Sequence, residues 1–157
     1  MGLEIERKFL VDHEKWEHVD KPIGIPYQQG YMLRDGEQTI RVRVSDKKGY
    51  LNFKSKVSAL SRKEYEYEIP LDEGLELLKA FTTNGTEKIR YLVPFKGKIW
   101  EVDVFSGDNA GLIVAEIELR SETEAFEKPD WVTTEVTYDG RYTNAGLSIH
   151  PYKDWRM

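Results

Sequence analysis

The sequence predicts a mainly β protein of the α+β kind, in which eight antiparallel strands close into a barrel. The barrel is a tunnel with a charged lumen, and short helices pack outside it. Three observations predict this fold. Strand-like runs alternate with turn signals, apolar and charged residues alternate within the runs, and charges of one sign recur two residues apart. The 157 residues fit a single domain over 1–157.

Eight runs have the composition and the period of strands. Several are separated by dipeptides that tolerate tight hairpin turns, namely Asp35-Gly36, Lys48-Gly49 and Lys96-Gly97. Hairpins between sequence neighbours favour an antiparallel meander over a doubly wound parallel sheet. The predicted strands are Leu3–Val11, Pro26–Leu33, Gln38–Ser45, Gly49–Lys56, Arg62–Pro70, Thr86–Pro94, Lys98–Phe105 and Leu112–Arg120.

Short helical segments are expected in the gaps between these strands. One aspartate is placed to cap a turn that carries a tryptophan, and another precedes a helix with its apolar residues on one face. A third segment begins with the spacing of a capping box. The segments are Asp12 to Trp16, Asp72 to Phe81 with Leu75 and Leu78 on the apolar face, Ser121 to Glu124, and Asn144 to Ile149.

The composition excludes several classes of protein. The chain contains no cysteine, so disulfides and thiolate metal sites are excluded, and a cytoplasmic location is expected. The net charge of −5 argues against a general nucleic-acid binder, so no nucleic-acid partner is expected. No run approaches the roughly 20 apolar residues of a membrane span, so no membrane partner is expected either.

Charges of one sign are doubled on one face of seven predicted strands. Residues i and i+2 of a strand lie about 6.6 Å apart. Like charges at that distance repel by roughly 0.6 kcal/mol in water and by roughly 2.5 kcal/mol at an effective dielectric near 20. The acidic pairs are Glu4 and Glu6, Glu64 and Glu66, Glu101 and Asp103, and Glu116 and Glu118; the basic pairs are Arg41 and Arg43, Lys54 and Lys56, and Lys88 and Arg90.

A solvent-facing sheet explains the charges of any single strand. Repetition on seven strands favours a shared lumen, where acidic pairs face basic pairs across a bound ligand. A polyanion with its metal cations is such a ligand, because carboxylates bind metals while lysine and arginine bind phosphate oxygens. The apolar faces then point outward. Trp100 and the outward tyrosines therefore lie either under helices or in a homodimer surface.

The ordered set of charged motifs resembles the triphosphate tunnel metalloenzymes, the CYTH superfamily, in their short bacterial type. The N-terminal Glu4-Ile5-Glu6-Arg7-Lys8 is similar to the E-x-E-x-K signature of that superfamily. The stretch from Glu135 to Asn144 resembles a motif near the C-terminus of the short bacterial members. The other matching motifs, in family order, are Arg41-x-Arg43, Lys54, Glu64-x-Glu66, Lys88-x-Arg90, Asp103 and Glu116-x-Glu118.

The resemblance implies divalent-metal-dependent hydrolysis of a small-molecule triphosphate, either inorganic triphosphate or a compact organic one such as thiamine triphosphate or a nucleotide. Mg²⁺ or Mn²⁺ is the implied cofactor, with two ions when substrate is bound, since carboxylate oxygens suit both metals. Two alternatives stay open. One is an adenylate cyclase that makes cAMP and pyrophosphate from ATP; the other is a non-catalytic binder of polyphosphate or nucleotides.

The resemblance and the charge pattern agree on residue roles. The expected catalytic residues are Glu4, Glu6, Lys8, Lys88 and Asp103. The expected metal ligands are Glu4, Glu6, Asp103, Glu116 and Glu118. The expected triphosphate-binding residues are Lys8, Arg41, Arg43, Lys54, Lys56, Lys88, Arg90 and Arg141. The role of two further lumen carboxylates, Glu64 and Glu66, stays open. They are metal ligands, supports of the ligands, or partners of basic side chains.

Two further expectations concern the ends of the tunnel. Glu68 and Glu101 are expected at a rim, where a solvated charge is the simplest explanation. Arg141 and Tyr142 either close one tunnel end near the substrate or form a structural clasp.

Overall fold

The strands and helices follow the predicted order along the chain. The structure, a computed structural model, describes residues 2–58, 60–82 and 85–155. Its strands are β1 Gly2–Val11, β2 Ile25–Arg34, β3 Gln38–Val44, β4 Gly49–Lys56, β5 Ser61–Ile69, β6 Gly85–Phe95, β7 Lys98–Phe105, β8 Ile113–Glu118 and β9 Val132–Glu135. The helices are α1 His13–Glu17, α2 Leu71–Phe81 and α3 Asn144–Ile149, with 3₁₀ turns η1 Gly107–Asn109, η2 Gly140–Tyr142 and η3 Tyr152–Asp154.

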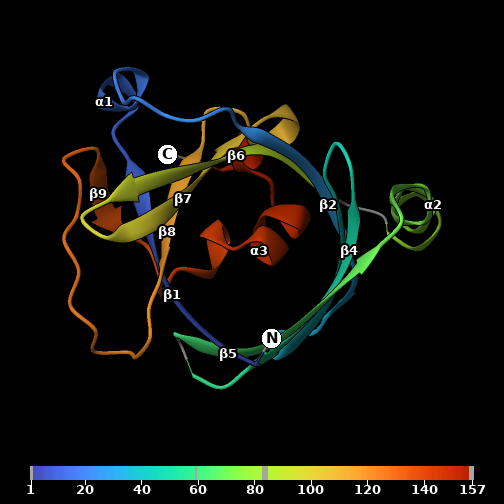
Figure 1. Cartoon of the computed structure of the whole chain (residues 1–157). Coiled ribbons are helices and arrows are strands. Elements are labelled where there is room, and N and C mark those ends of the chain that lie inside the picture. Colours follow the sequence, from blue (N-terminus) through green and yellow to red (C-terminus); the bar gives the residue numbers. More distant parts are fainter. Residues whose placement is uncertain (1, 59, 83–84, 156–157) are drawn as a thin grey trace.

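The strands β1 to β8 form a closed antiparallel barrel, which confirms the predicted architecture. Their order around the barrel is β5-β4-β3-β2-β6-β7-β8-β1, and β1 pairs with β5 to complete the ring (Figure 1). The first half of β1 pairs with β5 and its second half with β8. The predicted limits of these eight strands differ from the observed ones by at most two residues at either end.

The ring is two meanders rather than one. The hairpin-linked strands β2 to β5 form one meander and β6 to β8 the other, while α2 carries the chain from β5 to β6. The ninth strand, β9, pairs with the end of β1 through Phe9↔Glu135 and Val11↔Val132. The sequence prediction missed β9 because four residues are too few to display an alternating pattern.

The helices agree with the prediction in part. The Asp12 carboxylate accepts a hydrogen bond from the Lys15 backbone N–H at 3.0 Å, which confirms the cap of α1. The helix predicted after Ser121 is wrong: this stretch is a turn, in which Glu124 accepts a hydrogen bond from the Arg120 N–H and pairs with Lys98. No helix among the described residues is long and apolar enough to cross a bilayer.

Helix α2 lies on the outside of the barrel but does not bury its apolar face. Leu75 is 47% exposed and Phe81 is 64% exposed. The helix approaches the sheet through Gly74, where a Cβ would lie 2.7 Å from Val44 Cγ1. Since contact is made on the glycine side, the apolar residues of α2 are turned partly toward solvent.

Helix α3 lies within the ring of strands, whereas α1 and α2 lie outside it (Figure 1). Its Leu147 is 1% exposed and packs against Phe105, Leu112 and Val114. Phe105 and Val114 share the lumen faces of Asp103 and Glu116, so this end of the lumen is apolar. Residues 139–155, here called the closing segment, therefore shut one end of the barrel.

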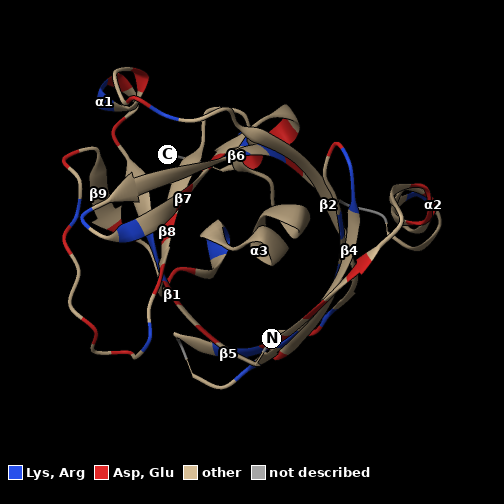
Figure 2. Cartoon of the chain, viewed as in Figure 1, with Lys and Arg blue, Asp and Glu red and all other residues tan. Residues whose placement is uncertain are grey.

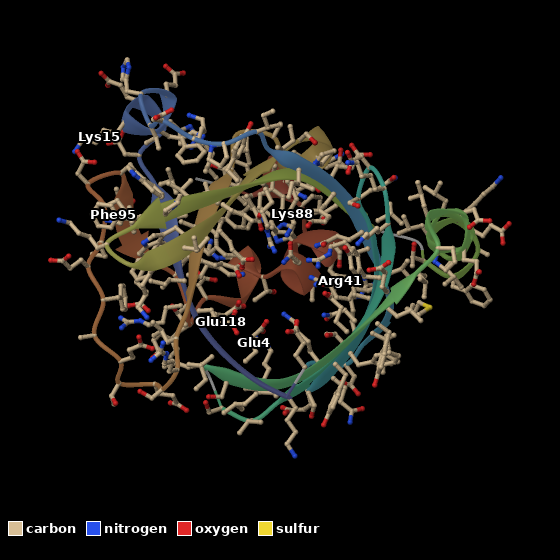
Figure 3. All side chains as sticks on the ribbon, in the orientation of Figure 1. Glu4, Lys15, Arg41, Lys88, Phe95 and Glu118 are labelled. Carbon is tan, nitrogen blue, oxygen red and sulfur yellow. The ribbon has the colours of Figure 1, made fainter. Side chains whose placement is uncertain are left out.

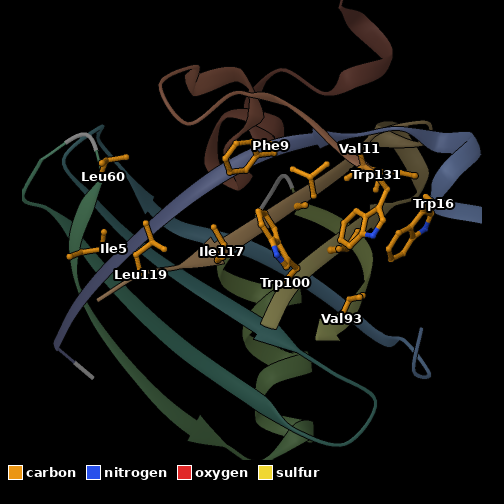
Figure 4. Packing of buried hydrophobic residues seen from close by; sticks show 14 residues of the cluster. Ile5, Phe9, Val11, Trp16, Leu60, Val93, Trp100, Ile117, Leu119 and Trp131 are labelled. Atoms are coloured by element: carbon orange, nitrogen blue, oxygen red, sulfur yellow. The ribbon is translucent and has the colours of Figure 1, made fainter. Parts of the chain in front are cut away.

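The main hydrophobic core lies outside the barrel wall, as the charge pattern predicts. Trp100 on β7 is 0% exposed and packs edge-on against Phe9 and Trp131 (Figure 4). It also packs edge-on against Phe126. The cover comes from α1 and from residues 119–131 of the same chain. Trp100 is thus covered by residues of the same chain. Tyr65 and Tyr67 on β5 are exposed, so the homodimer surface expected from the sequence stays a prediction.

Replacing Trp100 tests this outer core. We expect Trp100→Ala to lower the free energy of unfolding by about 3–5 kcal/mol, because a large fully buried side chain is lost. Ile99→Ala is the matched control, since Ile99 is 51% exposed on the same strand, and its effect should stay within about 0.5 kcal/mol. Urea unfolding measures both; equal losses in the two variants would contradict a core on this face.

Candidate active site

Charged side chains from separate strands converge inside the barrel. Lysines, arginines and carboxylates line the strands of the ring (Figure 2). Glu4, Arg41 and Lys88 point into its interior, whereas Lys15 and Phe95 point away from it (Figure 3). Ion pairs across neighbouring strands connect the inward-facing residues, which include Glu4, Lys8, Arg43, Lys54, Glu64, Glu66, Lys88, Arg90, Glu101, Asp103 and Glu116.

Carboxylates of β1, β5 and β8 form the acidic side of the lumen. Lys54 Nζ lies 3.0 Å from Glu4 Oε1 and 3.7 Å from Glu64 Oε2. Lys8 Nζ lies 3.3 Å from Glu116 Oε1. Burial, and then the nearby Glu116 charge, raises the pKa of Glu6 to about 8. Burial opposes ionisation of Glu116 too, but Lys8, Arg90 and a hydrogen bond from Glu6 hold its pKa well below the usual range.

A second cluster joins β6 to β7. Asp103 Oδ2 lies 2.8 Å from Lys88 Nζ, while Arg90 contacts both Asp103 oxygens, with Nε 2.8 Å from Oδ1 and Nη2 3.0 Å from Oδ2. Burial would raise the pKa of Asp103, but Arg90 and Lys88 lower it to about 2. Burial lowers the pKa of Lys88 to about 7. The positive charges of Arg90 and Arg41 add to this shift, and the negative charge of Asp103 opposes it. Both oxygens of Asp103 are therefore committed to cations.

The arginines of β3 line the opposite wall. Arg43 Nη2 lies 3.1 Å from Glu66 Oε2, and its guanidinium lies over the rings of Tyr27 and Tyr50. Arg41 and Arg43 are both buried, and the Nε of each has no hydrogen-bond partner in the described part of the chain. Unsatisfied buried donors on a cation are costly and favour an anionic ligand.

The closing segment contacts two of the lumen lysines, Lys8 and Lys88. Lys8 Nζ donates to the Tyr142 carbonyl at 3.2 Å, and Lys88 Nζ donates to Asn144 Oδ1 at 3.3 Å. A cavity of about 470 Å³ lies between this segment and the barrel wall. Its lining combines lumen residues, among them Glu6, Lys8, Arg41 and Lys54, with Thr143, Asn144 and Gly146 of the closing segment.

Several predicted site residues lie at the margins of the lumen. Lys56 is exposed and lines the cavity. Glu118 is exposed at the end of β8. Arg141 is exposed outside the cavity lining, where it pairs with Asp139 at 2.7 Å and stacks near Tyr142 and Trp155. Glu101, expected at a solvated rim, instead pairs with Arg90 at 3.2 Å.

The charge pattern overlooked neutral residues of the lumen. Asn52 lies two residues before Lys54 on the same face, is 1% exposed and donates to Glu64 and Glu66. Tyr27 and Gln29 share the lumen face of β2. Alternation alone identifies these three as inward-facing, because strand parity does not depend on charge. Asn144 had no such signal, since the sequence does not place α3 inside the ring.

The donor set of the acidic side suits a hard divalent cation. Glu4, Glu6 and Glu116 supply carboxylate oxygens, which Mg²⁺ and Mn²⁺ prefer. Burial and the neighbouring Glu116 raise the pKa of Glu6 even though Lys54 and Lys8 oppose the shift. Among the described residues, no group of three or more carboxylates or histidines is close enough to hold a metal ion as it stands. Lys8 and Lys54 pair with the carboxylates instead.

The pKa of Glu6 predicts a pH effect on metal-free protein. Since this pKa rises from 4.5 to about 8 on folding, the folded state keeps a proton that the unfolded state releases. Stability therefore falls as pH rises from about 4.5 to about 8. Glu6→Gln cannot ionise and should be the more stable protein at about pH 8, with the difference shrinking toward about pH 5. Urea unfolding in chelator measures this; a constant difference across that range would contradict it.

Comparisons with known proteins agree on one family. The CYTH domain matches residues 2–143. A protein of Acetivibrio thermocellus named inorganic triphosphatase is 46% identical over 157 residues, which cover 99% of each chain. A Nitrosomonas europaea protein of the same name is 35% identical over 93% of this chain and 97% of its own. A solved structure of an inorganic triphosphatase superposes with a TM-score of 0.63 and 33% identity, covering 93% of this chain and 94% of the other.

Proposed function

The chain belongs to the CYTH domain family, and from that premise we propose that it hydrolyses a triphosphate with the help of a divalent metal, Mg²⁺ or Mn²⁺. The observation that carries the proposal is the enclosed lumen, in which buried carboxylates and buried cations face one space (Figure 3). Such a space suits a ligand that brings both phosphate oxygens and metal cations.

Inorganic triphosphate is the substrate that the observations favour. Two relatives, 46% and 35% identical, carry the name inorganic triphosphatase. The closing segment shuts the apolar end of the lumen, and the cavity beside it is lined by cations that include Arg41, Lys54 and Lys8. These features suit a compact, highly charged chain of phosphates better than a large organic group.

The basic residues hold the phosphates. Arg41 and Arg43 offer Nε donors that have no partner among the described residues. Lys8, Lys54, Lys88 and Arg90 reach the same space from β1, β4 and β6. When a triphosphate enters, these cations exchange part of their pairing with carboxylates for phosphate oxygens.

The carboxylates divide into two groups. Glu4, Glu6 and Glu116, with Glu118 at the rim, are the proposed metal ligands, and the bound metal would offset phosphate charge and lower the pKa of a bound water. Asp103 is better suited to orient Lys88 and Arg90, because both of its oxygens already contact them. Glu64 and Glu66 are proposed as partners of Lys54 and Arg43.

The reaction is attack of water on a terminal phosphorus. The cations and the proposed ligands fix the phosphate chain, so that the attacking and leaving oxygens lie roughly in line. Burial and Glu116 raise the pKa of Glu6 to about 8, while Lys8 and Arg90 hold the pKa of Glu116 low, so this pair is the group that we propose to move a proton on this side of the lumen.

A phosphate-release assay tests the proposal. Purified protein should release phosphate from inorganic triphosphate with Mg²⁺ or Mn²⁺, and activity should vanish with chelator. ATP and thiamine triphosphate are tested in parallel, with cAMP and pyrophosphate also measured. Formation of cAMP would replace the hydrolase with a cyclase, and tight binding without any product would replace it with a binding protein.

Glu6→Gln tests the proposed ligand group. We expect it to lower kcat by about 100-fold or more, because a charged ligand is lost, while the fold is kept. Glu68→Gln is the matched control: Glu68 lies on the rim in an exposed pair with Lys48, and its loss should change kcat by less than about twofold. Full activity of Glu6→Gln would remove Glu6 from the site.

A further inference from the structure

Asn144 lies where the closing segment meets the charged part of the lumen. It is the first residue of α3, and its Oδ1 accepts a hydrogen bond from Lys88 Nζ at 3.3 Å. It also lines the cavity that Lys8 and Arg41 line. The charge pattern gave this neutral residue no role, although it ends the C-terminal motif.

The Lys88 ammonium is held from two sides. Its side chain is 0% exposed, and its Nζ contacts Asp103 Oδ2 at 2.8 Å and Asn144 Oδ1 at 3.3 Å. An ammonium group carries three N–H donors in a tetrahedral arrangement, so two fixed acceptors direct the third donor. With Asp103 alone, the flexible lysine stem leaves the ammonium free to turn about a single contact.

The surroundings of Asn144 keep it in place. Thr143 Oγ1 accepts a hydrogen bond from the Gly146 N–H at 2.9 Å and caps α3. A Cβ at Gly146 would lie 2.2 Å from the Gly140 carbonyl oxygen, so α3 packs tightly on η2. Leu147 is buried in the apolar end of the lumen, and Ser148 binds Arg34 at 2.8 Å. The helix is therefore seated by contacts other than the one to Lys88.

We propose that Asn144 is a positioning residue, which aims the Lys88 ammonium at a phosphate oxygen of the substrate. The closing segment then completes the active site in addition to covering the end of the barrel. This inference rests on the proposed triphosphate hydrolysis and adds to it a residue outside the barrel strands.

Three variants separate this role from simple support of α3. Asn144→Leu removes the acceptor and should lower kcat by about 10- to 100-fold with little change in the thermal midpoint. Asn144→Asp keeps an acceptor but adds a negative charge, so it should keep most of kcat and raise KM for triphosphate. Ser148→Ala lies on the same helix without contacting a lysine, and its kcat should stay within about twofold of wild type.

Two kinetic outcomes would overturn the proposal. One is Asn144→Leu with kcat within about twofold of wild type; the other is Ser148→Ala with an equal loss, which would assign the effect to seating of α3. If Asn144→Leu does not fold, Asn144→Asp decides, since a kcat loss as large as that of Lys88→Met would contradict an acceptor role.

An NMR measurement tests the contact between Lys88 and Asn144 without any catalytic turnover. In protein with ¹⁵N-labelled lysine, the buried Lys88 ammonium should give a protected NMR signal, assigned by its loss in Lys88→Met. That signal should persist in Ser148→Ala and broaden or shift in Asn144→Leu. An unchanged signal in Asn144→Leu would overturn the proposal even if triphosphate hydrolysis holds. Conversely, a wild-type protein without hydrolysis would reject the proposed function, while this signal still reports on the contact.

Discussion

Charge compensation across an enclosed space is the constraint on which the rest of this structure depends. The lumen buries Lys8, Arg41, Arg43, Lys88, Asp103 and Glu116 in one small volume. Unpaired charges in such a place cost several kcal/mol each, so each needs a partner of the opposite sign. The antiparallel register supplies some of these partners, as in the pairing of Arg90 with Asp103, but it also places Glu101 opposite Glu116. Pairing is incomplete at Glu6, where the proposed metal would supply positive charge.

A charged interior forces the hydrophobic core to the outside of the barrel wall. Apolar side chains alternate with the lumen residues and must be covered, which explains why α1 and residues 119–131 wrap around Trp100. The interior becomes apolar at the end where Phe105 and Val114 pack against Leu147 of α3. That apolar end seats the closing segment, and the closing segment in turn reaches Lys8 and Lys88.

The alternation of side chains within strands allowed the barrel and most of the lumen to be predicted from sequence. Residues two apart in a strand share one face, so a single inward-facing residue identifies the others of that strand. Residues such as Glu4, Arg41 and Lys88 converge for that reason. Elements whose sequence shows no such repeating pattern could not be predicted in this way. The four-residue β9 is too short to show a period. The capping-box spacing after Ser121 occurs in a turn. In α2, Gly74 is buried against the barrel while Leu75 and Phe81 are exposed. The position of α3 depends on long-range packing of Leu147, which no local pattern reports.

We propose that one enclosed space binds both the metal and the triphosphate. A crystal structure with Mn²⁺ and inorganic triphosphate, recorded with anomalous scattering, measures this most directly. We expect an anomalous peak among the Glu4, Glu6 and Glu116 carboxylates, with the phosphates against Arg41, Arg43 and Lys88. Metal and phosphate bound on the outer surface, with the Lys8–Glu116 and Lys54–Glu4 pairs of the lumen intact, would contradict it.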